Sequence, residues 1–558
     1  MKKFFLLFAS LFFFKPQVGL SQNTVGLLRY TPEKSSEGYN LFFPHNQSTT
    51  FLMDNCGNIV HTWQLPDTMR PGNAAYLLEN GSLIRCSRPN NIINDPIWAG
   101  GGGQFVDVVD WSGDILHRFE RNDEVFRLHH DIAPLPNGNV LMIAWEKKDA
   151  PSAIAAGRNP QLLPQQELWS ETILEWSPIL DSIVWQWEAW DHLVQDFDPS
   201  KANYGRVQEQ VGKIDVNYDE QDGHPDWLHC NAIAYNPVLD QIVLSIPHFN
   251  EFWIIDHSTT TAEAKTNQGG NFGKGGELLY RWGNPKTYLR DQDTTQQLFF
   301  QHHTRWLHPN AAPDDPDFGK ILLFNNRIHP DYSTGMVIPT PLDWSTQSYT
   351  LDPGKAFLPD SASQIIRHPE ADAPKDQSDG LSSIQRLENG NWLVFFGRWG
   401  YGVELTPENE IVWEYVVPLR AGKPVPQGTS LSSNNNLSFQ MTRYPISFPA
   451  FDGKDLSQGS PLEINPDNSL CLSTSLNPPR TFVQNAFRVY PNPAASQVFV
   501  DNYSKEKLHF VRLFGIDGQL QREWTPIQDQ YAFDVSTLNP GFYLVVTNLG
   551  VQSLIINR

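Results

Sequence analysis

Apolar runs of strand length recur along most of the chain, and turn signals such as Asn-Gly separate them. In the clearest copy, an apolar run from Leu381 ends at Asn389 and Gly390, a second covers residues 392–397, and the last contains Trp413. Short apolar runs bounded by turn residues are typical of β-strands. This module therefore predicts a four-stranded antiparallel sheet.

The same module recurs at four other places, which begin near Ala74, His130, His229 and His302. Residues 50–63 hold only the last two strands of one more module, and we expect the missing strands to come from residues 437–451. Pairing the two ends closes a ring, which leaves no sheet edge open. Five modules and one shared module predict an all-β fold, a six-bladed β-propeller over residues 22–452.

The pattern changes after about Ala450. Residues 453–484 are rich in Pro, Ser, Asn and Leu, which predicts a linker. Short alternating runs then begin at Phe487, with turns at Asp517-Gly518 and at residues 539–541. They predict a small β-sandwich over residues 485–558.

The N-terminus has the pattern of a secretory signal peptide over residues 1–21. Lys2 and Lys3 precede an apolar stretch at residues 4–14, and small residues stand before Gln22. The stretch is too short to cross a bilayer, and no later segment predicts a transmembrane helix. We therefore expect a secreted protein or one at the outer cell surface, where its four cysteines are free to form disulfides.

Composition narrows the range of partners. The 558 residues carry a net charge of −21, which argues against nucleic acid and anionic lipid as partners. Trp residues, 18 in all, favour packing between sheets, as we expect for Trp176, Trp185, Trp187 and Trp413.

The candidate chemistry lies on the first strand of each module. In a propeller these strands line the central channel, so equivalent positions converge on the axis. Seven residues before the turn, the five modules hold Asn73, His130, His229, His302 and Ser382. Histidine supplies only 16 of the 558 residues, so three at one register predict a functional cluster.

Two chemistries fit this cluster, a metal site and acid–base or nucleophilic catalysis on a polar ester. Asp131 and Cys230 adjoin it, but adjacent residues of a strand point to opposite faces, which weakens both as metal ligands. The glycine run at residues 100–103 lacks the strand–helix context of a phosphate-binding loop, so we interpret it as an ordinary loop.

Residues 39–450 resemble the bacterial arylsulfate sulfotransferases. The resemblance is carried by His130-Asp-Ile, residues 135–139, residues 226–231, residues 253–256, Gln301-His302 and residues 323–326. It implies transfer of a sulfuryl group from a phenolic sulfate ester to a phenolic acceptor, without a nucleotide donor, a cofactor or a metal.

The same resemblance implies roles for single residues. His302 is the expected nucleophile, with His130 and His229 as catalytic partners, because an imidazole can attack sulfur and become a sulfo-histidine. Asn231, His248, His303 and Arg305 are the expected substrate-binding residues.

The chain departs from the family pattern at one point, where the family commonly has an arginine and residues 245–248 here read Ser-Ile-Pro-His. Arg305, Arg327, Arg367 and Arg398 are the candidates to replace that guanidinium, which is suited to bidentate contacts with sulfate.

Residues 485–558 resemble the type IX secretion sorting domain of Bacteroidetes, through Tyr490-Pro-Asn-Pro493, Asp517-Gly518 and residues 538–543. This implies the type IX secretion machinery as a partner. For the propeller, two alternatives remain beside sulfotransfer: a non-catalytic module that binds a glycan, a phenolic compound or a protein, and a metal-dependent enzyme.

Overall fold

The computed structural model describes residues 23–92, 95–290, 296–370, 376–471, 487–502, 507–515, 520–525, 530–547 and 550–557. The predicted signal peptide and residues 472–484 of the predicted linker lie outside the described residues. The chain divides into two compact units, Met1–Leu470 and Cys471–Arg558.

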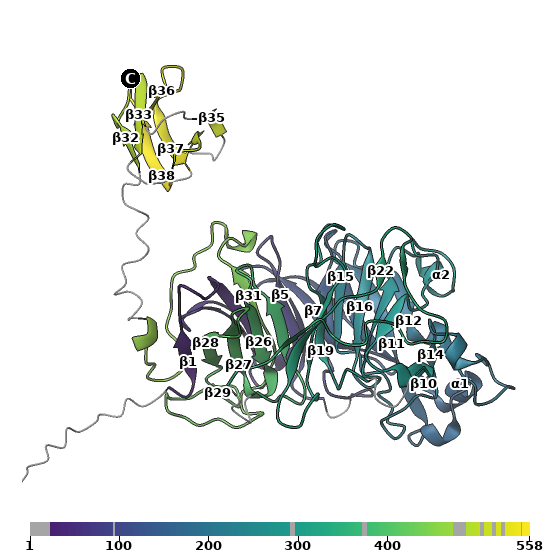
Figure 1. The fold of residues 1–558 in the computed structure, drawn as a ribbon. Coiled ribbons are helices and arrows are strands. Elements are labelled where there is room, and N and C mark those ends of the chain that lie inside the picture. Colours follow the sequence, from purple (N-terminus) through teal and green to yellow (C-terminus); the bar gives the residue numbers. More distant parts are fainter. Residues whose placement is uncertain are drawn as a thin grey trace, which may run out of the picture. The chain divides into compact units, whose positions relative to one another are not determined.

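Six antiparallel sheets of four or five strands build the described part of the first unit (Figure 1). In each sheet the strand named first below is the one that contacts the neighbouring sheets around the ring, and we call it the innermost strand. The first three sheets are β5 (Met69–Leu77), β6 (Leu83–Pro89), β7 (Phe105–Val109) and β8 (Ile115–Glu120); β9 (Phe126–Pro134), β10 (Val140–Asp149), β11 (Glu167–Ser177) and β12 (Ser182–Glu188); and β15 (Ala232–Asn236), β16 (Gln241–Ile246), β17 (Glu251–Asp256) and β18 (Tyr280–Trp282).

The other three sheets include both ends of the unit. They are β19 (His302–Trp306), β20 (Ile321–Asn325), β21 (Thr334–Ile338) and β24 (Gln364–Ile366); β25 (Ser383–Arg386), β26 (Trp392–Phe396), β27 (Tyr401–Leu405), β28 (Ile411–Val416) and β1 (Gly26–Tyr30); and β31 (Ser438–Pro445), β2 (Gly38–Pro44), β3 (Thr49–Asp54) and β4 (Ile59–Gln64).

The innermost strands contact one another in a closed circle, in the order β5, β9, β15, β19, β25, β31 and back to β5. The ring closes differently from the prediction, which took two strands of the shared sheet from each end. Here three come from the N-terminal side, because β2 pairs with both β3 and β31, and only β31 comes from the far end.

Short elements fill the loops of this unit. Two-stranded ladders join β13 (Leu193–Val194) to β14 (Ile214–Asp215), β22 (Leu342–Asp343) to β23 (Ser348–Tyr349), and β29 (Leu419–Arg420) to β30 (Lys423–Pro424). The helices are α1 (Ala150–Ala155), η1 (Pro160–Leu162), η2 (Ala189–His192), η3 (Val207–Glu209), α2 (Thr261–Ala264), η4 (Pro285–Tyr288), η5 (Gly397–Trp399) and η6 (Pro449–Phe451). Over the described ranges, none of the helices has the length and apolar character that crossing a bilayer requires.

Apolar side chains pack between neighbouring sheets, as the tryptophan pattern predicts. One buried cluster joins Ile143 and Trp187 of the second sheet to Leu244 and Ile255 of the third. Trp413 is also fully buried. Burial of such large side chains supplies much of the hydrophobic stabilisation of the ring.

The first part of the predicted linker is not a free segment. Pro461 forms a β-bridge with Asn58, and Ile464 forms one with Pro426. These residues belong to the first unit. Cys56 and Cys471 are disulfide-bonded, whereas Cys86 and Cys230 are free and buried.

The second unit contains two antiparallel sheets that share one apolar core. Val500 of one sheet and Leu513 of the other are fully buried in it. The sheets are β32 (Phe487–Tyr490), β33 (Gln497–Asn502) and β36 (Gln530–Asp534), and β35 (Leu520–Trp524), β34 (Val511–Gly515), β37 (Gly541–Thr547) and β38 (Gly550–Ile556).

Candidate functional site

A local kink occurs within the innermost strands or just before them. Asn73, His130, His229 and Ser382, which share one sequence register, all have a positive φ, from 50° to 103°. In the fourth sheet the positive φ of 53° falls on His303 instead of His302. Non-glycine residues rarely adopt this left-handed conformation, and it is concentrated at functional sites.

The three predicted catalytic histidines line one cavity of about 360 Å³. They come from three neighbouring innermost strands or the residues just before them, and the rings of His130 and His229 lie 4.6 Å apart between centroids. The register used in the sequence analysis therefore brings His130, His229 and His302 together, as predicted.

The lining of this histidine cavity is strongly basic. Besides the three histidines it contains His45, Arg70, Arg88, Arg327 and Arg398, and no Asp or Glu is among its described lining residues. In a chain with a net charge of −21, such a lining is suited to an anionic ligand.

The His302 ring is oriented by its neighbours. Nδ1 lies 2.9 Å from the amide oxygen of Asn326, which makes Nδ1 the protonated nitrogen and leaves a lone pair on Nε2. The Asn326 amide is itself held by the carbonyls of Ser378 and Leu381. Burial lowers the pKa of His302 to about 3 against the opposing effect of the hydrogen bond that Nδ1–H donates to Asn326, so the ring is neutral near pH 7.

His229 is bound to a carboxylate instead. Its Nδ1 lies 2.5 Å from Oδ2 of Asp226. Burial alone would lower the pKa of His229, but the Asp226 charge and hydrogen bond outweigh it and raise that pKa. His248 stacks on His229 at 4.7 Å, and its Nδ1 donates to the Asp226 carbonyl.

His130 has a third kind of partner. Its Nδ1 lies 2.9 Å from Nδ1 of His129, whose Nε2 lies 2.8 Å from the Glu171 carboxyl group. His129 and Glu171 are almost fully buried, at 2% and 1% exposed. No role was assigned from the sequence to His129 or to Glu171, which lies on the third strand of the sheet.

Arg70 is on the innermost strand β5, whereas the other three arginines of the cavity come from outside the innermost strands. Arg327 follows β20, lies over the Phe300 ring at 3.6 Å and donates from Nε to the Asp379 carbonyl. Arg398 lies in η5 and forms an ion pair with the Asp379 side chain. Two of the four candidates to replace the family arginine therefore reach the cavity, whereas Arg367 stacks on Tyr332 outside it.

The glycine run also belongs to the cavity, which its interpretation as an ordinary loop missed. Gly101 has a φ of 87°, and a Cβ atom there would lie 2.1 Å from the His130 ring. Its carbonyl accepts from the His130 N–H and from the Asn73 side chain. Only glycine allows the loop to approach His130 so closely.

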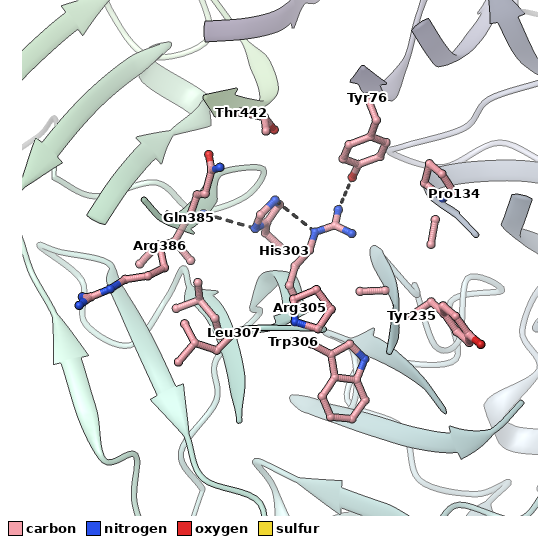
Figure 2. A pocket seen from close by; sticks show the side chains of 15 residues that line it. Tyr76, Pro134, Tyr235, His303, Arg305, Trp306, Leu307, Gln385, Arg386 and Thr442 are labelled. Atoms are coloured by element: carbon pink, nitrogen blue, oxygen red, sulfur yellow. Dashed lines mark hydrogen bonds between the residues drawn. The ribbon is translucent and has the colours of Figure 1, made fainter. Parts of the chain in front are cut away.

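His303 and Arg305 lie elsewhere, contrary to their expected place beside the catalytic histidines. They line a second cavity of about 380 Å³ among the same innermost strands (Figure 2). Arg305 pairs with Asp131 at 2.8 Å and donates to Tyr76 and to the Ile233 carbonyl. Both are an odd number of residues from His302, so the alternation of side chains along β19 directs them away from it.

Asn231 contacts the site only indirectly. It is fully buried and donates to the Gln301 carbonyl at 2.9 Å, so it supports the backbone just before His302. Asp226, His229 and His248 have side-chain atoms close enough together to suit a metal, and of these three only His229 lines the histidine cavity. The 2.5 Å between Asp226 Oδ2 and His229 Nδ1 is a hydrogen-bond distance, shorter than the roughly 3.3 Å between two ligands on one tetrahedral zinc ion.

Comparison with known proteins identifies two regions of the chain. The family model described as Arylsulfotransferase (ASST) matches residues 29–418, and the one described as Secretion system C-terminal sorting domain matches residues 488–556. No curated protein matches the chain.

Solved structures with low sequence identity also match. A protein of unknown function from Bacteroides caccae is 11% identical with a TM-score of 0.37, over 73% of this chain and 99% of its own. Streptogramin B lyase is 9% identical with a TM-score of 0.32, over 77% and 95%. Apo AztD from Citrobacter koseri is 9% identical with a TM-score of 0.31, over 73% and 98%.

The match at residues 488–556 confirms the predicted type IX sorting domain. The protein is therefore secreted or held at the cell surface. The predicted all-β, propeller-like fold is confirmed as well.

Proposed function

The chain belongs to the arylsulfotransferase family, and on that premise we propose that it moves a sulfuryl group from a phenolic sulfate ester to a phenolic acceptor through His302. No nucleotide donor takes part in this scheme. The observation that carries the proposal is the histidine cavity, in which a neutral, oriented imidazole lies among four arginines with no carboxylate in the described lining.

The transfer takes two displacements. In the first, the lone pair on Nε2 of His302 attacks sulfur, the bond from sulfur to the aryl oxygen breaks, and a phenolate leaves. The Asn326 oxygen accepts from Nδ1–H throughout, so it stabilises the positive charge that develops on the ring. In the second, the acceptor oxygen attacks sulfur, the S–N bond breaks and His302 is restored.

The other groups of the cavity stabilise the negative charge on the sulfuryl oxygens and on the departing phenolate. The sulfuryl oxygens need preorganised donors, and Arg327 and Arg398 supply guanidinium groups. The Leu381 N–H donates to His302 Nε2 at 3.2 Å, so this bond must break before the lone pair attacks sulfur, and the released N–H can then donate to a sulfuryl oxygen. His229, whose pKa is raised by Asp226 against burial, offers a positive donor to the departing phenolate.

The test follows nitrophenol release from p-nitrophenyl sulfate with and without phenol. We expect release that depends on phenol, and a loss of at least about 1000-fold in His302→Ala, since removal of a nucleophile abolishes the covalent route. His329→Ala, which removes a half-exposed histidine outside the cavity, is the matched control and should keep full activity. Release that survives in His302→Ala, or that is equally fast without phenol, contradicts the proposal.

A further inference from the structure

Two imidazole rings connect a buried carboxyl group to the histidine cavity. The chain of contacts runs from His130 to His129 over 2.9 Å and from His129 to Glu171 over 2.8 Å. Only His130 lines the cavity, and the other two side chains have at most 1% of their surface exposed. A pair of ring nitrogens in direct contact requires that one carries the proton and the other accepts it.

The surrounding structure holds each member in place. The backbone N–H of Cys230 donates to Oε1 of Glu171, which leaves Oε2 for His129. The His129 ring stacks flat on Trp145 at 3.9 Å, and Trp145 is paired with Glu171 across β10 and β11. Three adjacent strands of one sheet thus build a fixed path from its interior to the cavity.

We propose that Glu171 and His129 form a proton relay that draws the proton of the acceptor phenol through His130 into the protein interior. This inference rests on the proposed function, because it assigns the base for the second displacement. Glu171 and His129 touch no substrate and act only through His130.

The relay moves one proton over three bonds. Before the step, Glu171 is ionised, His129 carries its proton on Nε2 and His130 carries its proton on Nδ1, so His130 Nε2 has a free lone pair. The phenol gives its proton to His130 Nε2 as its oxygen bonds to sulfur, His130 Nδ1–H passes to His129 Nδ1, and His129 Nε2–H passes to Glu171 Oε2. Both rings end neutral, Glu171 ends as the acid, and the phenol proton is accounted for.

Burial favours this end state. It lowers the pKa of His130 and of His129 well below the ordinary value, so neither ring holds a positive charge well. Burial also raises the pKa of Glu171 well above its ordinary value, which favours the neutral acid.

The charges that face the relay come from several elements. Asp226 and His229 face both Glu171 and His129, and Arg127 faces His129. His229, His302 and His248 face His130. His229, whose own pKa is raised, adds to the cost of a positive charge on His130.

Glu171→Gln tests the relay because it locks the proton positions. With Oε1 still accepting from Cys230, the amide NH₂ donates to His129 Nε2, so His129 Nδ1–H donates to His130 Nδ1 and His130 Nε2 is left as a donor that accepts no proton. We expect the first burst of nitrophenol to be unchanged, since nitrophenolate leaves without needing a base. Transfer to phenol should slow on the order of 100-fold, within the usual range for loss of a general base.

A series of acceptor phenols with different pKa values distinguishes a proton relay from a purely structural role of Glu171, because a structural role would not make the transfer rate depend on the ionisation of the acceptor. Phenols already ionised at the assay pH need no base, so Glu171→Gln should transfer to them nearly as fast as the wild type. The wild-type rate with phenol should fall as pH drops through the raised pKa of Glu171, because the carboxylate form is lost below it, and the variant should lack this acid limb.

Glu175→Gln is the matched control, since Glu175 is a buried carboxylate on the same strand but is bound to His257 instead. It should leave the acceptor series unchanged. The relay is overturned if Glu171→Gln transfers to phenol at the wild-type rate, slows all acceptors equally, or loses the burst. A wild-type enzyme without any burst would instead contradict the proposed function itself.

Discussion

The same innermost strands line two cavities, and the arginines of these cavities differ in whether a carboxylate beside them neutralises their charge. The histidine cavity holds four arginines and no described lining carboxylate, and Asp379, a half-exposed residue outside that lining, is the ion-pair partner of Arg398. In the second cavity, Arg305 is neutralised by Asp131 and bonded to Tyr76 and a backbone carbonyl. Under the proposed function, positive charge is left available where the sulfate ester binds, whereas Arg305 is paired where neighbouring strands are held together.

The largest effect should come from breaking the pair in the second cavity. Arg305→Met leaves the fully buried carboxylate of Asp131 without its cation, which should lower the free energy of unfolding by about 3–5 kcal/mol. Urea denaturation measures this change. Arg386→Met in the same cavity is the control, because Arg386 has no ion-pair partner in the described residues and should cost less than about 1 kcal/mol.

A second substitution, which removes the unpaired charge of Asp131, tests the cause of this loss of stability. In the double variant with Asp131→Asn, part of the lost stability should return, since the buried group is then neutral. Equal stability of the single and double variants would show that the Arg305–Asp131 pair does not carry the effect.

The second prediction places a carboxylate in the cavity that lacks one. Arg398→Glu should reduce kcat/KM for p-nitrophenyl sulfate by about 100-fold or more, because a charged donor worth about 1.5–3 kcal/mol is replaced by a repulsive anion. Steady-state kinetics at low salt provide the measurement. Arg386→Glu makes the same charge change in the second cavity and should leave kcat/KM within about twofold. A similar loss in both variants would indicate a general effect of net charge.

The third prediction concerns the backbone that shapes the histidine cavity. Gly101→Ala adds a Cβ that would lie 2.1 Å from the His130 ring, so either the ring or the loop must move. We expect kcat/KM to fall about tenfold, in line with a displacement of a catalytic group by a fraction of an ångström. Gly113→Ala is the control, because Gly113 also has a positive φ of 99° but nothing within 4 Å. Both variants should lose about 1 kcal/mol of stability from backbone strain, and only the first should lose activity.

Three histidines of the cavity could be predicted together because strand periodicity and a turn give a reliable register. His130, His229 and His302 share that register, and the ring brings them together. His303 and Arg305 were assigned through the family resemblance instead, and their odd spacing from His302 directs both side chains to the second cavity.

Other parts of the site had no usable signal in the sequence. Arg327 and Arg398 reach the cavity from segments after β20 and β26, and a count along the innermost strands cannot place them. Glu171 lies on a third strand, and its contact with His129 depends on pairing across the whole sheet. The repeats were enough to predict the fold class. They did not show that β2 pairs with β31, so the number of strands that each end of the chain contributes to the shared sheet was predicted incorrectly.

The last prediction has the smallest expected effect: the rate of the first nitrophenol burst should not depend on pH. It tests whether the absence of carboxylates from the histidine cavity keeps His302 neutral. Burial lowers the pKa of His302 to about 3, so the ring stays neutral from pH 7 to pH 5 and the rate of the first nitrophenol burst should stay nearly constant. A histidine with the ordinary pKa of about 6.5 would lose roughly 20-fold over the same range. Asn326→Asp sets a carboxylate beside Nδ1, which should raise the pKa of His302 and make the burst fall as pH drops through the new value. His257, which lies between Glu175 and Asp240, illustrates the effect, since their hydrogen bonds and charges outweigh burial and raise its pKa to about 9. Stopped-flow bursts across this range decide the matter: a steep acid limb in the wild type, or none in Asn326→Asp, would show that the absence of carboxylates is not what keeps the nucleophile neutral.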